Sequence, residues 1–101
     1  MMLVLINTFE VQPGKEDAFL EAWRRVSDVM EARPGFLQTR LHRCTSAPRF
    51  INVAEWESLE AFAAAINSPE FRAAAAPLRE LGRESPALYE LVYEAGTPPL
   101  A

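Results

Sequence analysis

Cysteine and histidine are almost absent from this chain of 101 residues. Cys44 is the only cysteine and His42 the only histidine, so an internal disulfide, a cysteine-based metal site and a site with several histidine ligands are excluded. Glycine is also scarce, with four residues, and no glycine-rich phosphate-binding or dinucleotide-binding motif is present. The sequence therefore carries no recognisable signature of a bound group, and we expect no cofactor and no metal.

Long apolar runs and basic clusters are missing as well. The longest apolar run, Met1 to Ile6, is too short to span a membrane and lacks the basic flank of a signal peptide. The net charge is −4, so the electrostatic signature of a nucleic-acid-binding protein is absent. We expect a cytoplasmic protein with neither a membrane nor a nucleic acid as its partner.

Hydrophobic residues, in contrast, make up 50% of the chain, which is a high share for a small monomer. Their periodicity and the turn residues between them predict strands over 3–11, 36–43, 49–57 and 87–94, a helix over 15–32, and a helical region over 58–81 broken near Ser68. Ser58 and Ser68 are the expected N-caps, and Pro77 is expected to end or kink the last helix. This βαββαβ order is that of a ferredoxin-like α+β domain with a four-stranded antiparallel sheet. We expect one domain over residues 1–95 and a flexible tail over 96–101.

Both faces of the predicted sheet are apolar. In the first strand, one face carries Leu3, Leu5, Asn7, Phe9 and Val11, and the other carries Val4, Ile6, Thr8 and Glu10. Since the helices can cover only one face, we expect a second copy of the chain to cover the other, which gives a homodimer. The alternative is a monomer whose second face is solvated through its polar members, which are Glu10, Gln38, Arg40 and Glu55.

A hairpin loop over residues 45–48 would set the register of the middle strands by pairing Cys44 with Arg49 and Leu41 with Asn52. The face expected beneath the helices would then receive three residues of the second strand, which are Leu37, Thr39 and Leu41. His42 would lie on the opposite face, where no partner for a general base is evident.

Polar groups within the helix-side face are the candidates for function. Two amides, of Asn7 and Asn52, and the indole N–H of Trp56 would lie among three aromatic rings, those of Phe9, Phe62 and Phe71. A few convergent polar groups in an apolar pocket are typical of a small-molecule site, here one for a flat aromatic ligand with one or two oxygens. The alternatives are amides bonded to nearby backbone and an indole that is plain core. Arg72 and Arg79 could meet a substrate anion or be solvated.

Three motifs that follow one another along the chain resemble the antibiotic biosynthesis monooxygenase family. They are Asn7-Thr-Phe-Glu-Val-x-Pro-Gly-Lys-x-x-x-Phe19, Arg33-Pro-Gly-Phe36 and Asn52-Val-Ala-Glu-Trp-Glu-Ser-x-Glu-Ala-Phe62. The resemblance covers residues 3 to about 95 and implies a dimeric α+β barrel.

The resemblance to the branch typified by actinorhodin-pathway monooxygenases implies oxidation of an aromatic polyketide by O₂ without metal, flavin or haem. Asn52 and Trp56 match that branch's pocket residues, whereas Phe62 stands where it has a tyrosine. Its pocket arginine would fall near Ala76, with Arg72 or Arg79 as the nearest substitutes. The haem-degrading branch shares the positions of Asn7 and Trp56. Its histidine ligand would fall near Ala74 or Ala75, and residues 71–81 contain no histidine.

The sequence therefore predicts a cofactor-independent monooxygenase that acts on a polyketide, anthrone or hydroquinone in a pocket between sheet and helices. The predicted catalytic residues are Asn52, Trp56 and Asn7, and the predicted substrate-binding residues are Phe9, Phe62, Phe71 and Arg72. A haem-degrading protein and a non-catalytic small-molecule-binding dimer are the alternatives.

Overall fold

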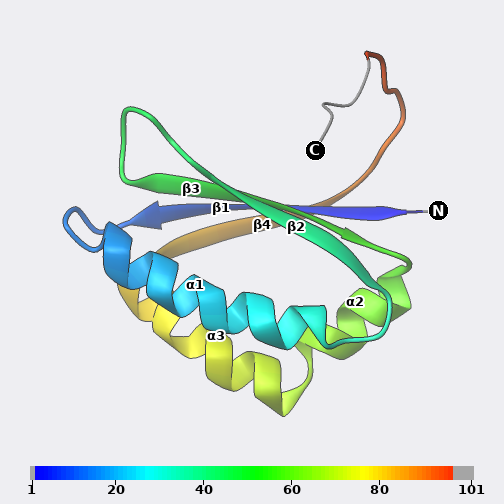
Figure 1. The fold of residues 1–101 in the computed structure, drawn as a ribbon, viewed down its shortest axis with the longest axis horizontal. Coiled ribbons are helices and arrows are strands. Elements are labelled where there is room, and N and C mark those ends of the chain that lie inside the picture. Colours follow the sequence, from blue (N-terminus) through cyan, green and yellow to red (C-terminus); the bar gives the residue numbers. More distant parts are fainter. Residues whose placement is uncertain (1, 97–101) are drawn as a thin grey trace.

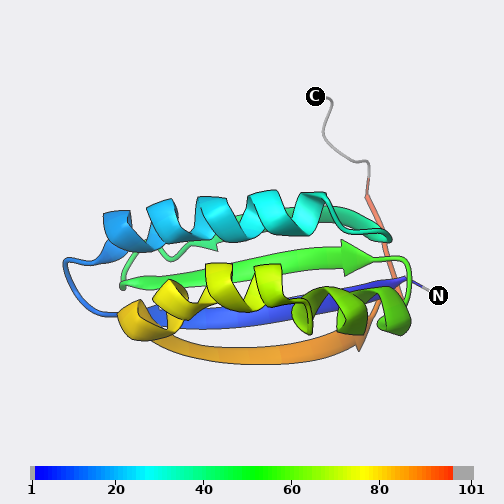
Figure 2. The same cartoon turned by 90° about the horizontal axis from the view of Figure 1, so that it is seen from below.

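The computed structural model describes residues 2–96. The elements follow one another as β1 (Leu3–Val11), α1 (Glu16–Glu31), β2 (Phe36–Arg43), β3 (Arg49–Trp56), α2 (Leu59–Ile66), α3 (Pro69–Leu81) and β4 (Gly82–Glu90). The four strands form one antiparallel sheet in the order β2-β3-β1-β4. All three helices lie against the same face of this sheet (Figures 1 and 2). The expected ferredoxin-like α+β fold is confirmed; most of the predicted tail, residues 97–101, lies outside the described residues.

The helix starts follow the predicted capping residues. The hydroxyl of Ser58 accepts a hydrogen bond from the backbone N–H of Ala61 at 3.1 Å, and Ser68 accepts one from Phe71 at 3.2 Å. Each bond satisfies an amide that the first helical turn leaves without a partner. Pro77 does not end α3, which continues to Leu81.

The last strand differs from its predicted bounds. β4 begins at Gly82, directly after α3, and ends at Glu90, whereas the sequence predicted residues 87–94. Pro86 therefore lies inside the strand, which is tolerated because β4 is an edge strand and need not donate on its outer side. A side chain at Gly82 would collide with the backbone of Glu10, so glycine lets the chain pass directly from helix to strand beside β1.

The predicted hairpin register is confirmed, with one local correction. Cys44 N–H donates to the Arg49 carbonyl at 2.8 Å, and Leu41 pairs with Asn52. A bulge between Phe36 and Gln38 places Phe36 opposite Trp56, so Leu37 is not beneath the helices and is 47% exposed. A bulge adds one residue to a strand, so the side chains before it point to the faces opposite to those that strict alternation predicts.

The core lies between the helices and the sheet face that carries Leu5, Phe9, Phe50 and Trp56. No element of the described chain covers the other face, which we call the open face (Figure 1). It carries apolar side chains in both central strands: Val4, Ile6, Ile51 and Val53. No helix in residues 2–96 is long and apolar enough to cross a membrane.

Gly35, in the turn after α1, lies close to Ala61 of α2. Its φ is +84°, and a Cβ placed there would lie 2.5 Å from the Cβ of Ala61. We expect Gly35→Ala to lower the free energy of unfolding by about 2–4 kcal/mol, the sum of a left-handed backbone penalty and overpacking. Urea unfolding measures this change. Gly14→Ala is the matched control, because Gly14 has the same φ but open space around it. An equal loss in both variants would show that the Ala61 contact contributes nothing.

Candidate functional site

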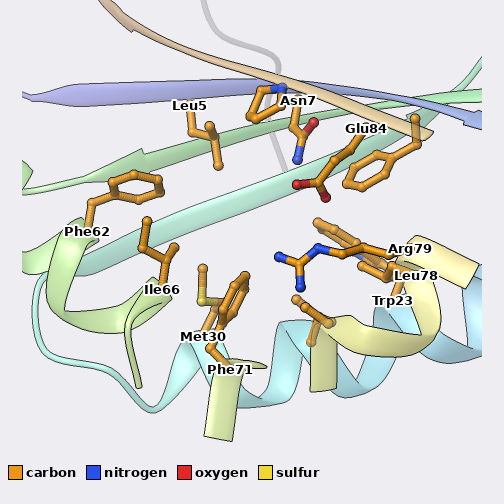
Figure 3. Close-up of a pocket in the computed structure, with 14 residues that line it drawn as sticks. Leu5, Asn7, Trp23, Met30, Phe62, Ile66, Phe71, Leu78, Arg79 and Glu84 are labelled. Atoms are coloured by element: carbon orange, nitrogen blue, oxygen red, sulfur yellow. The ribbon is translucent and has the colours of Figure 1, made fainter. Parts of the chain in front are cut away.

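A cavity of about 180 Å³, partly open to solvent, lies between the helices and the β1–β4 half of the sheet (Figure 3). Side chains from β1, β4 and all three helices line it. Most of its walls are apolar, among them Leu5, Phe9, Trp23, Met30, Phe62 and Phe71. The three aromatic residues predicted to bind substrate, Phe9, Phe62 and Phe71, are thus brought together around one space.

Three polar side chains, Asn7 from β1, Arg79 from α3 and Glu84 from β4, also line this cavity. Figure 3 shows them pointing into the same part of it. Asn7 is 8% exposed, and its Oδ1 has no hydrogen-bond partner in the described residues. An unsatisfied buried polar atom costs about 1–3 kcal/mol. Figure 3 shows the amide nitrogen of Asn7 turned toward the cavity, so this side chain can donate a hydrogen bond to a ligand there.

The pairing of β1 with β4 explains why Asn7 and Glu84 meet. Asn7 pairs with Pro86, and Phe9 pairs with Glu84. Residues two apart on a strand share a face, so Glu84 projects on the helix side, diagonally across from Asn7. The predicted strand 87–94 leaves Glu84 in a loop, so the sequence pattern does not single it out. The alternation of β4 identifies Glu84 once the strand is known to begin at Gly82.

Asn52 lies near the cavity but does not line it. Its Oδ1 accepts a hydrogen bond from the Thr39 hydroxyl of the neighbouring strand, and the residue is 4% exposed. It borders a separate void of about 20 Å³ that shares Leu5 and Trp23 with the cavity walls. The structure therefore gives the Asn52 amide a partner within the fold, although the β1–β3 register places Asn52 directly opposite Asn7.

Trp56 is fully buried beside the cavity and does not line it either. Its ring meets Phe36 and Phe62 edge-on, with centroid distances of 5.2 and 5.8 Å. Its indole Nε1 has no hydrogen-bond partner within residues 2–96. Phe62 lines the cavity and also packs on Trp56, so it connects the indole to the cavity wall.

The remaining polar candidates lie elsewhere. Arg72, predicted to bind substrate, is exposed, does not line the cavity and donates to Asn67 Oδ1 at 3.4 Å. Arg79, the other arginine considered on α3, lines the cavity instead. His42 is exposed, and its Nδ1 lies 3.3 Å from the carbonyl oxygen of Ile51, an open-face residue.

The chain offers little other chemistry outside the cavity. Hydrogen bonds from the backbone and side chain of Ser46 lower the pKa of the Cys44 thiol, which lies just before the β2–β3 loop. In the part of the chain that the structure describes, no three His, Cys, Asp or Glu residues gather as a metal site would require. The cavity is therefore the strongest candidate for function.

Comparison with known proteins identifies the family. The family model for antibiotic biosynthesis monooxygenases matches residues 2–77. The chain is 31% identical over 85 residues to a 42.8 kDa protein in the whiE locus of Streptomyces coelicolor; the match covers 83% of this chain but only 21% of that relative.

Solved structures share the fold. SnoaB, a cofactor-independent oxygenase from Streptomyces nogalater, superposes with a TM-score of 0.87 at 26% identity, covering 92% of this chain and 95% of SnoaB. Rv0793 from Mycobacterium tuberculosis superposes with a TM-score of 0.83 at 16% identity, covering 95% and 100% of the two chains. Since the family model matches about three quarters of its residues, the chain belongs to the antibiotic biosynthesis monooxygenase family.

Proposed function

We propose that this protein oxidises a small aromatic substrate with O₂, without a cofactor, inside the cavity between the sheet and the helices. The observation that carries the proposal is an apolar cavity into which Asn7, Arg79 and Glu84 converge. Membership of the monooxygenase family supports it. The similarity to SnoaB, a cofactor-independent oxygenase, favours chemistry without a bound group.

The size of the cavity limits the substrate. A cavity of about 150 Å³ lined by aliphatic and aromatic side chains holds one benzene ring. The space of about 180 Å³ found here therefore suits one ring or two fused rings, with any third ring in the open mouth. A hydroquinone, or an anthrone with one outer ring in the mouth, fits this description and supplies oxygens for the polar groups.

The polar groups suit a reaction that passes through an anion. A substrate that loses a proton becomes electron-rich enough to transfer an electron to O₂, and the resulting pair combines to a peroxide that loses water to give a quinone. The amide of Asn7 and the guanidinium of Arg79 would donate hydrogen bonds to the oxygen that carries the negative charge. Direct roles for Asn52 and Trp56 stay predictions, because neither residue lines the cavity.

Oxygen uptake tests the proposal. We expect saturable uptake with 1,8-dihydroxyanthrone or 1,4-dihydroxynaphthalene, and strongly reduced uptake in Asn7→Ala. Asn52→Ala and Trp56→Phe, measured beside it, report whether these two residues reach the substrate. Saturable binding with no uptake would favour the non-catalytic dimer. A stable Soret shift on haemin titration would instead favour the haem-degrading alternative.

Arg79 gives a matched pair of variants on one helix. We expect Arg79→Gln to raise KM about tenfold, which corresponds to about 1.4 kcal/mol for a lost charge-assisted hydrogen bond. Both arginines are exposed, but only Arg79 lines the cavity, so Arg72→Gln removes the same charge from α3 outside the cavity, and its KM should not change. Steady-state oxygen uptake measures both. Equal effects would assign the loss to net charge and not to contact with the substrate.

The open face is the proposed site of homodimer formation. Its central strands present apolar side chains that no described element covers, with Ile51 37% exposed. Leu91, Val92 and Tyr93, which follow β4, are 52%, 81% and 81% exposed. The segment after β4 rises on the side of the sheet opposite the helices (Figure 1). Apolar patches of this kind mark interaction sites. If two copies of the chain pack with their open faces together, each copy covers the open face of the other.

The cytoplasmic location stays a prediction.

A further inference from the structure

Glu84 is the one acidic side chain in the walls of the cavity. Its residue is half-buried on β4, and its carboxylate points toward Asn7 and Arg79 (Figure 3). The ion pairs within residues 2–96 join Arg25 to Glu21 and Arg49 to Glu10, so Glu84 is not held in one of them. Its carboxylate therefore remains available to a molecule that enters the cavity.

The position of Glu84 is not explained by packing. Pro86 and Leu88, the next residues on the same face of β4, are apolar but exposed, and Glu84 is less exposed than either. Placing a charged group against apolar walls costs free energy unless it is paired or solvated. A carboxylate at this point is suited to accept a proton from a bound substrate, since general bases must lie within hydrogen-bond reach of the proton they remove.

We propose that Glu84 is the proton acceptor of the reaction, an inference that rests on the proposed function. With an anthrone, a methylene C–H proton passes to a carboxylate oxygen of Glu84. The electron pair of that C–H bond moves into the ring system, and the charge settles on the carbonyl oxygen. Asn7 and Arg79 stabilise that oxygen by hydrogen bonds.

The later steps return Glu84 to its starting state. The carbanion passes one electron to O₂, and the radical and superoxide combine to form a C–O bond and a peroxide anion. Protonated Glu84 gives its proton to this anion. It then removes the second C–H proton, the O–O bond breaks, the ketone forms, and the departing hydroxide takes the proton from Glu84 as water. One methylene and one O₂ yield one ketone and one water.

Proton transfer can be observed apart from oxidation. Under nitrogen, wild-type protein mixed with 1,8-dihydroxyanthrone should develop the long-wavelength absorption of the anion, and Glu84→Gln should not, although it binds the neutral compound. Glu90→Gln is the matched control, because Glu90 lies on the same face of β4 but outside the cavity. Its anion absorption should equal that of the wild type.

Turnover provides the second readout. We expect Glu84→Gln to lower kcat at least about 100-fold, the usual contribution of a general base, and Glu84→Asp to retain part of the activity. In Glu84→Ala, added formate should restore turnover through the open mouth of the cavity. Anion absorption and turnover unchanged in Glu84→Gln would overturn the role of Glu84 and leave the proposed function standing. Absence of oxygen uptake by the wild type would overturn both.

Discussion

Replacing Ala75 with phenylalanine is expected to abolish binding of aromatic compounds while the fold is retained. Ala75 lies on α3, is 3% exposed and lines the cavity. A ring at this position would occupy the space that we assign to the substrate. We expect Kd for 1,4-naphthoquinone to rise at least about 30-fold, or about 2 kcal/mol, which is the value of burying one apolar side chain. Quenching of the tryptophan fluorescence measures the binding, because Trp23, one of the two tryptophans, lines the cavity.

The adjacent residue provides the control. Ala76 is exposed on the same helix and does not line the cavity, so Ala76→Phe should bind as the wild type does. Thermal unfolding of Ala75→Phe should remain cooperative, because the adjoining cavity of about 180 Å³ offers space for much of the added ring. Unchanged binding in Ala75→Phe would show that aromatic compounds bind elsewhere on the protein.

Replacing Val53 with glutamate is expected to convert a dimer into a monomer. Val53 pairs with Ile6 at the centre of the open face. If two copies meet there, the substitution buries an unpaired carboxylate in each, at a cost of several kcal/mol per charge. Light scattering after gel filtration should then change from twice the chain mass to the chain mass of 11.3 kDa.

Leu59→Glu is the control for this experiment. Leu59 is 54% exposed on α2, on the helical side of the molecule, so a charge there should leave the dimer intact. Because the cavity and the open face lie on opposite sides of the sheet, monomeric Val53→Glu should still bind aromatic compounds. A wild-type chain that is monomeric at all concentrations would contradict the assignment of the open face.

Local patterns predicted much of the fold. The bounds of β1 and β2, the N-caps at Ser58 and Ser68, and the pairing of Leu41 with Asn52 all follow from residues close together in the chain. Such features depend on backbone propensity, capping and alternation, which act over a few residues. The bulge before Gln38 and the early start of β4 depend instead on packing against partners far away in the sequence.

For the candidate site, too, some features follow from the local sequence and others depend on tertiary packing. Alternation along β1 and β3 was enough to place Asn7, Asn52 and Trp56 on the face beneath the helices, and all three are buried there. Only Asn7 lines the cavity, and this depends on packing with other elements: Thr39 donates to Asn52, and Trp56 packs against Phe36 and Phe62.

The low content of cysteine, histidine and glycine thus limited the candidate functional groups of the site to amides, arginine, carboxylates and aromatic rings. It did not identify the polar residues that line the cavity together. Asn7, Arg79 and Glu84 come from a strand, a helix and an edge strand that are distant in sequence. The direction of a side chain follows from its own backbone, but the space into which several side chains point exists only after the elements have packed.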